Sequence, residues 1–193
     1  DFTLSSSKST PSRDINAFGK VGAMSYGDAD IQPGTDYLWT VNLYQQALIR
    51  VDVSGNPTSV PSDVRQYILN TLPGYPTSST GILRPWGLTF AHGKGYLGVV
   101  DDASISTLQA NLKAIVLEFD PDNITAGFTQ KLSFDPNLKR QIAGSWIPFF
   151  PWINTYAEPP VTVNRGYYYR PQPVLSDMEF DEFGNMYVSF FDR

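Results

Sequence analysis

Four acidic side chains are the strongest candidates in this chain for binding a metal ion or a polar ligand. Asp28 and Asp30 lie in one short strand-like run, and Asp177 and Glu179 lie in another near the C-terminus. Alternation along a strand would put Asp28 and Asp30 on the same side. If both runs are the first strands of neighbouring sheets, the carboxylates could converge on a calcium ion or a polar ligand. They could instead accept hydrogen bonds from backbone N–H groups of the next sheet, which is the interpretation we favour.

A second group of acidic residues follows predicted strand ends. Asp101-Asp102 and Asp120-Pro-Asp-Asn123 both have the composition of turns. The spacing of an EF-hand loop and its closing Glu are missing from both. A surface calcium ion held by Asp120 and Asp122 is the alternative to two plain turns.

Other kinds of catalytic or metal chemistry find little support in the sequence. The chain has no Cys, which excludes disulfides, thiol nucleophiles and zinc–thiolate sites. Its one histidine, His92, lies in the predicted hairpin turn Ala91–Lys94, where it is typical of a turn residue. No Gly-x-Ser-x-Gly elbow and no Walker loop occurs. We therefore expect no enzyme activity.

The segment 144–172 is rich in aromatic residues and proline. Its prolines argue against a central strand, whereas its aromatic side chains favour burial, so we expect a long loop over one face of the domain. Exposed aromatic rings here could stack on the sugar rings of a glycan or form a protein-binding patch; folded inward, they would be core. The candidate binding residues are Trp146, Trp152, Tyr167, Tyr168 and Tyr169.

The strands that must position these residues occur in three similar groups, which open near residues 24, 84 and 173. Each group begins with a short alternating run, a turn and a second run, and the last is a hairpin signal around Asp181–Asn185. The predicted strands cover 24–31, 37–43 and 47–53, then 65–69, then 84–90, 95–101, 112–120 and 128–134, and finally 173–180 and 186–190.

Each group predicts an antiparallel sheet with one apolar face, which it can bury only against its neighbours. That arrangement is typical of a β-propeller, and a β-sandwich is the alternative. We therefore predict an all-β fold, with an extended N-terminal arm over 1–20 and a propeller-like domain over 21–193. Since two full groups and the front of a third do not fill a ring, we expect a partial propeller within a longer polypeptide, or one completed by a protein partner.

Charge and hydropathy limit the partners. The formal net charge is −5, and the longest run of basic residues is Lys139-Arg140, so the concentrated basic face that nucleic acids require is missing. No apolar run approaches the ~18 residues of a membrane-spanning helix, so we expect no membrane insertion.

Several of these motifs, in the same order, also resemble a known group of proteins. The matching segments are Tyr26–Asp30, Leu38–Leu43, Leu48–Asp52, Arg84–Leu88, Gly95–Val100, Pro173–Asp181 and Phe191–Arg193. They resemble large bacterial secreted or cell-surface proteins in which a propeller-like region often precedes SdrD B-like immunoglobulin-type repeats. The resemblance implies an extracellular location and an adhesive, structural or matrix role through protein–protein interaction. It implies no catalytic residues.

Two hypotheses for the function follow. The first is a non-catalytic, adhesin-like binding or structural module at the cell surface, which needs no cofactor. The second is a metal-dependent propeller hydrolase or lactonase, with a metal ion such as calcium in a central channel. Its ligands would be carboxylates such as Asp28 and Asp177.

Overall fold

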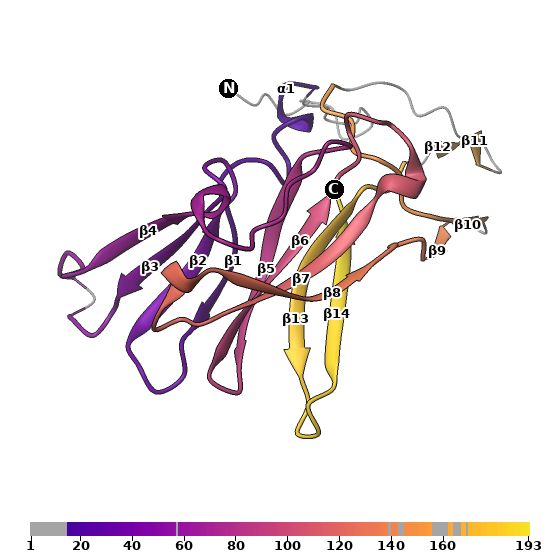
Figure 1. Cartoon of the computed structure of the whole chain (residues 1–193). Coiled ribbons are helices and arrows are strands. Elements are labelled where there is room, and N and C mark those ends of the chain that lie inside the picture. Colours follow the sequence, from indigo (N-terminus) through magenta and orange to yellow (C-terminus); the bar gives the residue numbers. More distant parts are fainter. Residues whose placement is uncertain are drawn as a thin grey trace.

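The computed structural model describes residues 15–56, 58–138, 140–142, 145–155, 162–163, 167–168 and 170–193. Their regular structure is almost entirely antiparallel β-sheet, which confirms the all-β prediction. The longer strands form three separate sheets that lie side by side, and the described residues do not close into a propeller (Figure 1).

The N-terminal sheet is a four-stranded meander. Its strands, in spatial order, are β1 (Tyr26–Ile31), β2 (Tyr37–Asn42), β3 (Ala47–Asp52) and β4 (Val64–Ile68). Alternation in β2 turns Trp39 and Val41 into the core, where both are fully buried. Gly34, with a φ of +78°, shapes the turn between β1 and β2.

The central sheet repeats this meander. Its strands, in spatial order, are β5 (Leu83–Ala91), β6 (Lys94–Asp101), β7 (Lys113–Phe119) and β8 (Phe128–Phe134). The turn between β5 and β6 consists of His92 and Gly93, whose φ angles of +53° and +72° suit a tight hairpin. The prediction of His92 as a turn residue is therefore confirmed.

The C-terminal hairpin consists of β13 (Pro173–Phe180) and β14 (Met186–Asp192). The carboxylate of Asp181 holds its turn, because one oxygen accepts hydrogen bonds from the backbone N–H groups of Phe183 (3.0 Å) and Asn185 (2.8 Å). These hydrogen bonds lower the pKa of Asp181, together with the bond from the Asn185 side chain, which has the largest effect.

The remaining elements are short. They are α1 (Ile15–Phe18), the 3₁₀ turns η1 (Leu69–Thr71), η2 (Gln109–Asn111) and η3 (Ile124–Ala126), and the strand pairs β9 (Arg140–Ile142) with β10 (Ser145–Ile147) and β11 (Thr162–Val163) with β12 (Tyr167–Tyr168). The segment that the sequence predicts as an extended arm thus contains a helical turn near its end, and residues 1–14 lie outside the described residues. No helix in the described part of the chain is long and apolar enough to cross a membrane.

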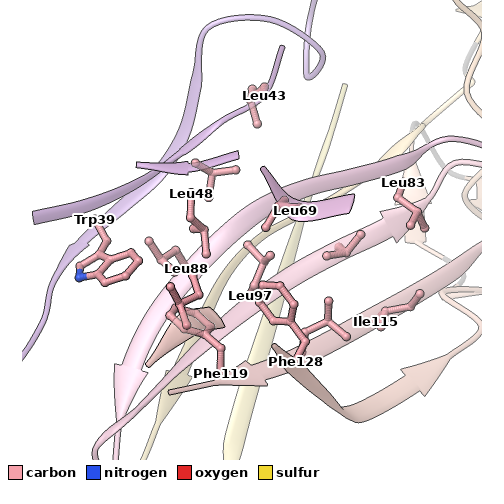
Figure 2. Close-up of a cluster of buried hydrophobic side chains, with 14 residues drawn as sticks. Trp39, Leu43, Leu48, Leu69, Leu83, Leu88, Leu97, Ile115, Phe119 and Phe128 are labelled. Carbon is pink, nitrogen blue, oxygen red and sulfur yellow. The ribbon is translucent and has the colours of Figure 1, made fainter. Parts of the chain in front are cut away.

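The core lies on both faces of the central sheet. One face packs against the N-terminal sheet, and Figure 2 shows Trp39 of β2 beside Leu88 and Phe119 in this cluster. The rings of Trp39 and Phe119 lie 5.7 Å apart. The other face packs against the C-terminal hairpin, where Leu175 and Met178 are buried. The two outer sheets therefore each keep one face with exposed side chains, whereas the central sheet is covered twice.

The first strands of the three sheets, β1, β5 and β13, lie next to one another. Each carries an irregularity of register at a corresponding place, between Tyr26 and Ala29, between Pro85 and Leu88, and between Leu175 and Asp177. A β-bulge of this kind bends a strand and re-aims its side chains. The bulges therefore set the direction of the acidic side chains that the sequence singled out.

Candidate functional site

Asp28 bridges the N-terminal and central sheets. Its Oδ1 accepts a hydrogen bond from the backbone N–H of Ala29 at 2.8 Å, and its Oδ2 accepts one from the backbone N–H of Leu88 in β5 at 3.0 Å. Both oxygens of the carboxylate are thus used to hold two strand edges together. Thr40 of β2 fixes the bulge from behind, because its hydroxyl donates to the carbonyl oxygen of Asp28 at 3.0 Å.

Asp30 repeats this arrangement one step along β1. Its Oδ1 accepts from the backbone N–H of Ile31 at 2.7 Å, and its Oδ2 accepts from the backbone N–H of Phe90 at 3.2 Å. The two carboxylates lie on the same side of β1, as alternation predicts. Their hydrogen bonds to the next sheet confirm the interpretation that we favoured from the sequence.

Close approach of the strands makes these bonds reachable. A Cβ atom added at Gly27 would lie only 3.1 Å from the carbonyl oxygen of Trp86, so β1 and β5 are nearly in backbone contact there. Gly87, at the position in β5 that corresponds to Asp28, has no carboxylate of its own. The N–H of Leu88 is therefore left for Asp28 to bind.

The electrostatics of Asp28 reflect its position between the sheets. Burial raises the pKa of Asp28, and the negative charges of Asp177 and Asp30 raise it further, while the hydrogen bonds from Leu88 and Ala29 oppose both effects. Asp177 of the C-terminal hairpin is thus close enough to act on Asp28 through its charge. The structure brings the predicted carboxylates of the first and third groups into one region.

Asp177 and Glu179 differ from Asp28 and Asp30 in their partners. Both side chains are exposed. Oδ1 of Asp177 accepts from the backbone N–H of Met178 at 2.7 Å, but no described residue donates to its Oδ2 or to the carboxylate of Glu179. The two acidic positions of the first strand are therefore hydrogen-bonded to the neighbouring sheet in β1, whereas in β13 no described residue of a neighbouring sheet donates to them.

Among the described residues, no group of three or more His, Cys, Asp or Glu side chains could hold a metal ion. Each oxygen of Asp28 and of Asp30 already accepts one backbone N–H, so an ion there would have to share oxygens that hold β1 against β5. The oxygens nearby to which no described residue donates are Oδ2 of Asp177 and those of Glu179.

Asp120 and Asp122 lie in the turn after β7 and have protein partners. Asp120 pairs with Lys94 at 3.1 Å, and the hydrogen bond from Lys94 is the largest of the effects that lower the pKa of Asp120. Oδ1 of Asp122 accepts from the side-chain amide of Gln32 at 2.8 Å, and Gln32 in turn accepts from the indole N–H of Trp39 at 3.1 Å. This turn thus links the central sheet to the N-terminal sheet, beside a small pocket of about 160 Å³.

Among the aromatic candidates, the structure describes the side-chain environment of Trp152. Trp152 is 1% exposed, and its indole N–H donates to the carbonyl oxygen of Pro173 at 2.8 Å, so its ring belongs to the interior. The backbones of Trp146, Tyr167 and Tyr168 lie in β10 and β12. Tyr169 lies outside the described residues.

A buried ion pair that the sequence did not predict lies at the end of β5 and β6 farthest from their turn. Asp102 is fully buried, and its Oδ2 accepts a hydrogen bond from Nε of Arg84 at 2.8 Å. Its Oδ1 accepts from the backbone N–H groups of Ile82 (2.8 Å) and Ser104 (2.9 Å). The buried charge is thus both paired and hydrogen-bonded, as a stable arrangement requires.

Trp152 connects this ion pair to both ends of the described chain. The guanidinium carbon of Arg84 lies 4.9 Å from the ring of Trp152, and that of Arg193 lies 4.4 Å from it. Arg193 also donates to the carbonyl oxygen of Phe18 in α1 at 2.8 Å. Burial and the nearby charge of Arg84 lower the pKa of Arg193 to about 10. The arrangement can fasten segments together, but it presents no unpaired nucleophile or base.

A register argument could have found the Arg84–Asp102 pair. With the hairpin turn at His92-Gly93, Leu83 pairs with Asp101, which brings the start of β5 beside the residues that follow β6. The turn composition of Asp101-Asp102 gave no sign that both residues are buried, as they are in the structure.

Comparisons with models of protein families, with curated proteins and with solved structures find no match for this chain.

Proposed function

We propose that this chain is a non-catalytic binding or structural module in which successive antiparallel sheets stack through their first strands. The observation that carries the proposal is the use of Asp28 and Asp30, each of which spends one oxygen on its own strand and the other on β5. A catalytic or metal-binding carboxylate needs lone pairs directed at a substrate or an ion. Carboxylates bound on both sides by backbone serve assembly instead.

The finer proposal for the fold is a partial propeller. Three sheets whose first strands adjoin, with a bulge at a corresponding place in each, are what consecutive blades around an axis would present. The missing blades would come from the remainder of a longer polypeptide or from a protein partner. An extracellular or cell-surface location, with an adhesin-like role, is proposed from the motif resemblance alone.

One observation favours the metal-dependent hydrolase or lactonase as the second candidate. The charge of Asp177 raises the pKa of Asp28, so carboxylates from two different sheets do approach one another near the first strands. Such convergence is what a channel metal would require. The two proposals differ in whether the carboxylates need an ion to balance their charge.

Elemental analysis combined with thermal unfolding separates the two candidates. We expect the chain, after dialysis against buffer without chelator, to carry no stoichiometric divalent ion and to unfold at the same temperature with calcium or with EDTA. A specific ion would instead stabilise the fold by about 2.7 kcal/mol at roughly 100 times its dissociation constant.

The variant Asp177→Asn locates any effect. A calcium-dependent rise in the unfolding temperature that disappears in Asp177→Asn, but persists in the control Glu182→Gln on the same hairpin, would contradict the non-catalytic proposal and favour a channel metal.

A further inference from the structure

We infer that the exposed face of β13 and β14 is a docking surface for the first strand of a further antiparallel sheet, carried by a protein partner that is not a second copy of this chain. The inference rests on the proposed function, because it extends the carboxylate-to-backbone contact seen between β1 and β5. At β13, the docked strand would donate a backbone N–H to Asp177, as β5 donates one to Asp28.

The local geometry of Asp177 matches that of Asp28. In both residues, Oδ1 accepts from the backbone N–H of the following residue, Ala29 at 2.8 Å and Met178 at 2.7 Å. In Asp28 this leaves Oδ2 directed at the neighbouring sheet, where Leu88 donates to it. Oδ2 of Asp177 is left in the corresponding position, and no described residue donates to it.

The second strand supports Asp177 in the same way as it supports Asp28. Thr40 in β2 donates its hydroxyl to the carbonyl oxygen of Asp28 at 3.0 Å, and Ser189 in β14 donates to that of Asp177 at 3.4 Å. Both hydroxyls come from the strand paired with the bulge. The C-terminal hairpin therefore holds Asp177 in the conformation of Asp28, but no strand among the described residues donates to its Oδ2.

The rest of this face suits a docked strand. Glu179 stands at the position of Asp30 and is exposed, and Tyr187, paired with Glu179 across the hairpin, is 61% exposed. The surface thus offers two carboxylates and a large amphipathic ring. Aromatic rings of this kind are enriched in protein interfaces.

A second copy of this chain does not offer the strand that this surface needs. In β1, the outward N–H groups of Ala29 and Ile31 are already bound by their own preceding carboxylates. In β5, the outward N–H groups are bound by β1. Docking β1 of another copy would also bring Asp28 and Asp30 against Asp177, and like charges at an interface are unfavourable.

The partner strand must therefore resemble β5. It needs free N–H groups on alternate residues of its outer edge, and no acidic residue directly before either of them. In β5 these preceding positions are Gly87 and Thr89. A glycine also allows a close approach of backbones, since a Cβ at Gly87 would lie 3.1 Å from the carbonyl oxygen of Leu175.

A peptide with the sequence of β5, Leu83–Ala91, is the probe. It is titrated into the whole ¹⁵N-labelled chain, and the backbone amide signals are followed. We expect saturable shifts at Met178, Glu179 and Ser189. The matched control is the same peptide N-methylated at Leu88 and Phe90, which loses the two donors without a change of charge and is expected not to bind.

Protein variants locate the contact. Asp177→Ala should weaken binding of the β5 peptide roughly 10- to 100-fold, the usual value of a hydrogen bond to a charged group. Glu182→Ala, which removes the same charge from the turn of the same hairpin, should leave the affinity unchanged.

Three results would overturn the inference. They are the absence of shifts on β13 and β14, equal binding of the N-methylated peptide, and a peptide-free dimer formed through this face. Its failure is distinguishable from failure of the proposed function. The loss of stability expected for Asp28→Ala depends on the contact between β1 and β5 and not on any partner.

Discussion

The central sheet meets its two neighbours through the same strand, β5, but by different means. Toward the N-terminal sheet, the backbone of β5 donates hydrogen bonds to the carboxylates of Asp28 and Asp30. Toward the C-terminal hairpin, Gly87 lies against the backbone of β13, and the fully buried Leu175 fills the space above Gly98. One contact is polar and directional, and the other depends on close packing.

The residue type at the bulge decides how two first strands meet. An acidic residue at the bulge, as in β1, accepts one hydrogen bond from its own strand and one from the next strand. A glycine there, as in β5, brings the next backbone close. In β13 the corresponding residue, Asp177, is again acidic, but no described strand donates a hydrogen bond to its Oδ2. The bound carboxylate of Asp28 in the contact between β1 and β5 can therefore be compared directly with the exposed carboxylate of Asp177 in β13.

The largest expected effect is on the packed contact. Leu175→Ala should lower the free energy of unfolding by about 2–5 kcal/mol, because it leaves a cavity between the central sheet and the hairpin. Denaturant unfolding measures the loss, with the partly exposed Leu132→Ala as control. A cost no larger than that of the control would show that packing does not hold this contact.

The polar contact comes next. Asp28→Ala should cost roughly 1.5–3 kcal/mol, since it removes a charged acceptor from two backbone N–H groups. The matched variant Asp177→Ala should cost less than about 0.5 kcal/mol in the isolated chain, as is usual for an exposed position. If both variants lose the same free energy of unfolding, the hydrogen bond from β5 to Asp28 does not stabilise the fold.

A methyl group at Gly87 tests the close approach. Gly87→Ala should lower the free energy of unfolding by about 1 kcal/mol, because the added Cβ would meet backbone atoms of β13. Gly55→Ala is the control, since a Cβ there has open space. If both variants are neutral, the backbones of β5 and β13 are not held as close as the structure places them.

The smallest effect is electrostatic. Because the pKa of Asp28 is higher in the folded protein than in the unfolded chain, folding takes up a proton between the two values. The extra stability from protonating Asp28 is present below the unfolded pKa and is lost as the pH rises through the folded pKa, whereas the hydrogen bonds that the ionised carboxylate accepts remain. Asp177→Asn removes a nearby negative charge and should lower the pKa of Asp28 in a carboxyl NMR titration. An unchanged pKa would mean that the two carboxylates do not interact.

Much of the fold could be predicted from the sequence, because short alternating runs and turn residues report strands directly. The predicted strand over 128–134 agrees with β8, and the possible strand over 65–69 lies within one residue of β4. The three sheets of longer strands also follow from the repeated strand–turn–strand pattern. What the sequence could not show is the register irregularity in each first strand, because a bulge depends on tertiary contacts.

The candidate site could be predicted only in part. The side on which Asp28 and Asp30 lie follows from alternation, and their hydrogen bonds to the next sheet were the favoured interpretation. The burial of Asp102 beside Arg84 was missed, because its partner is 18 residues away across a hairpin. Trp152 illustrates a different limit, since composition alone does not reveal which rings of an aromatic segment turn inward.

Hydrogen exchange at the backbone amide of Leu88 reports directly on the hydrogen bond between β5 and Asp28. If Asp28 clamps β5, this amide is protected in the wild-type chain and exchanges at least about tenfold faster in Asp28→Ala. The amide of Leu117, in β7 of the same sheet, should change only as much as global stability does. Equal protection of Leu88 in both proteins, after correction for global stability, would show that Asp28 does not hold β5 through this amide.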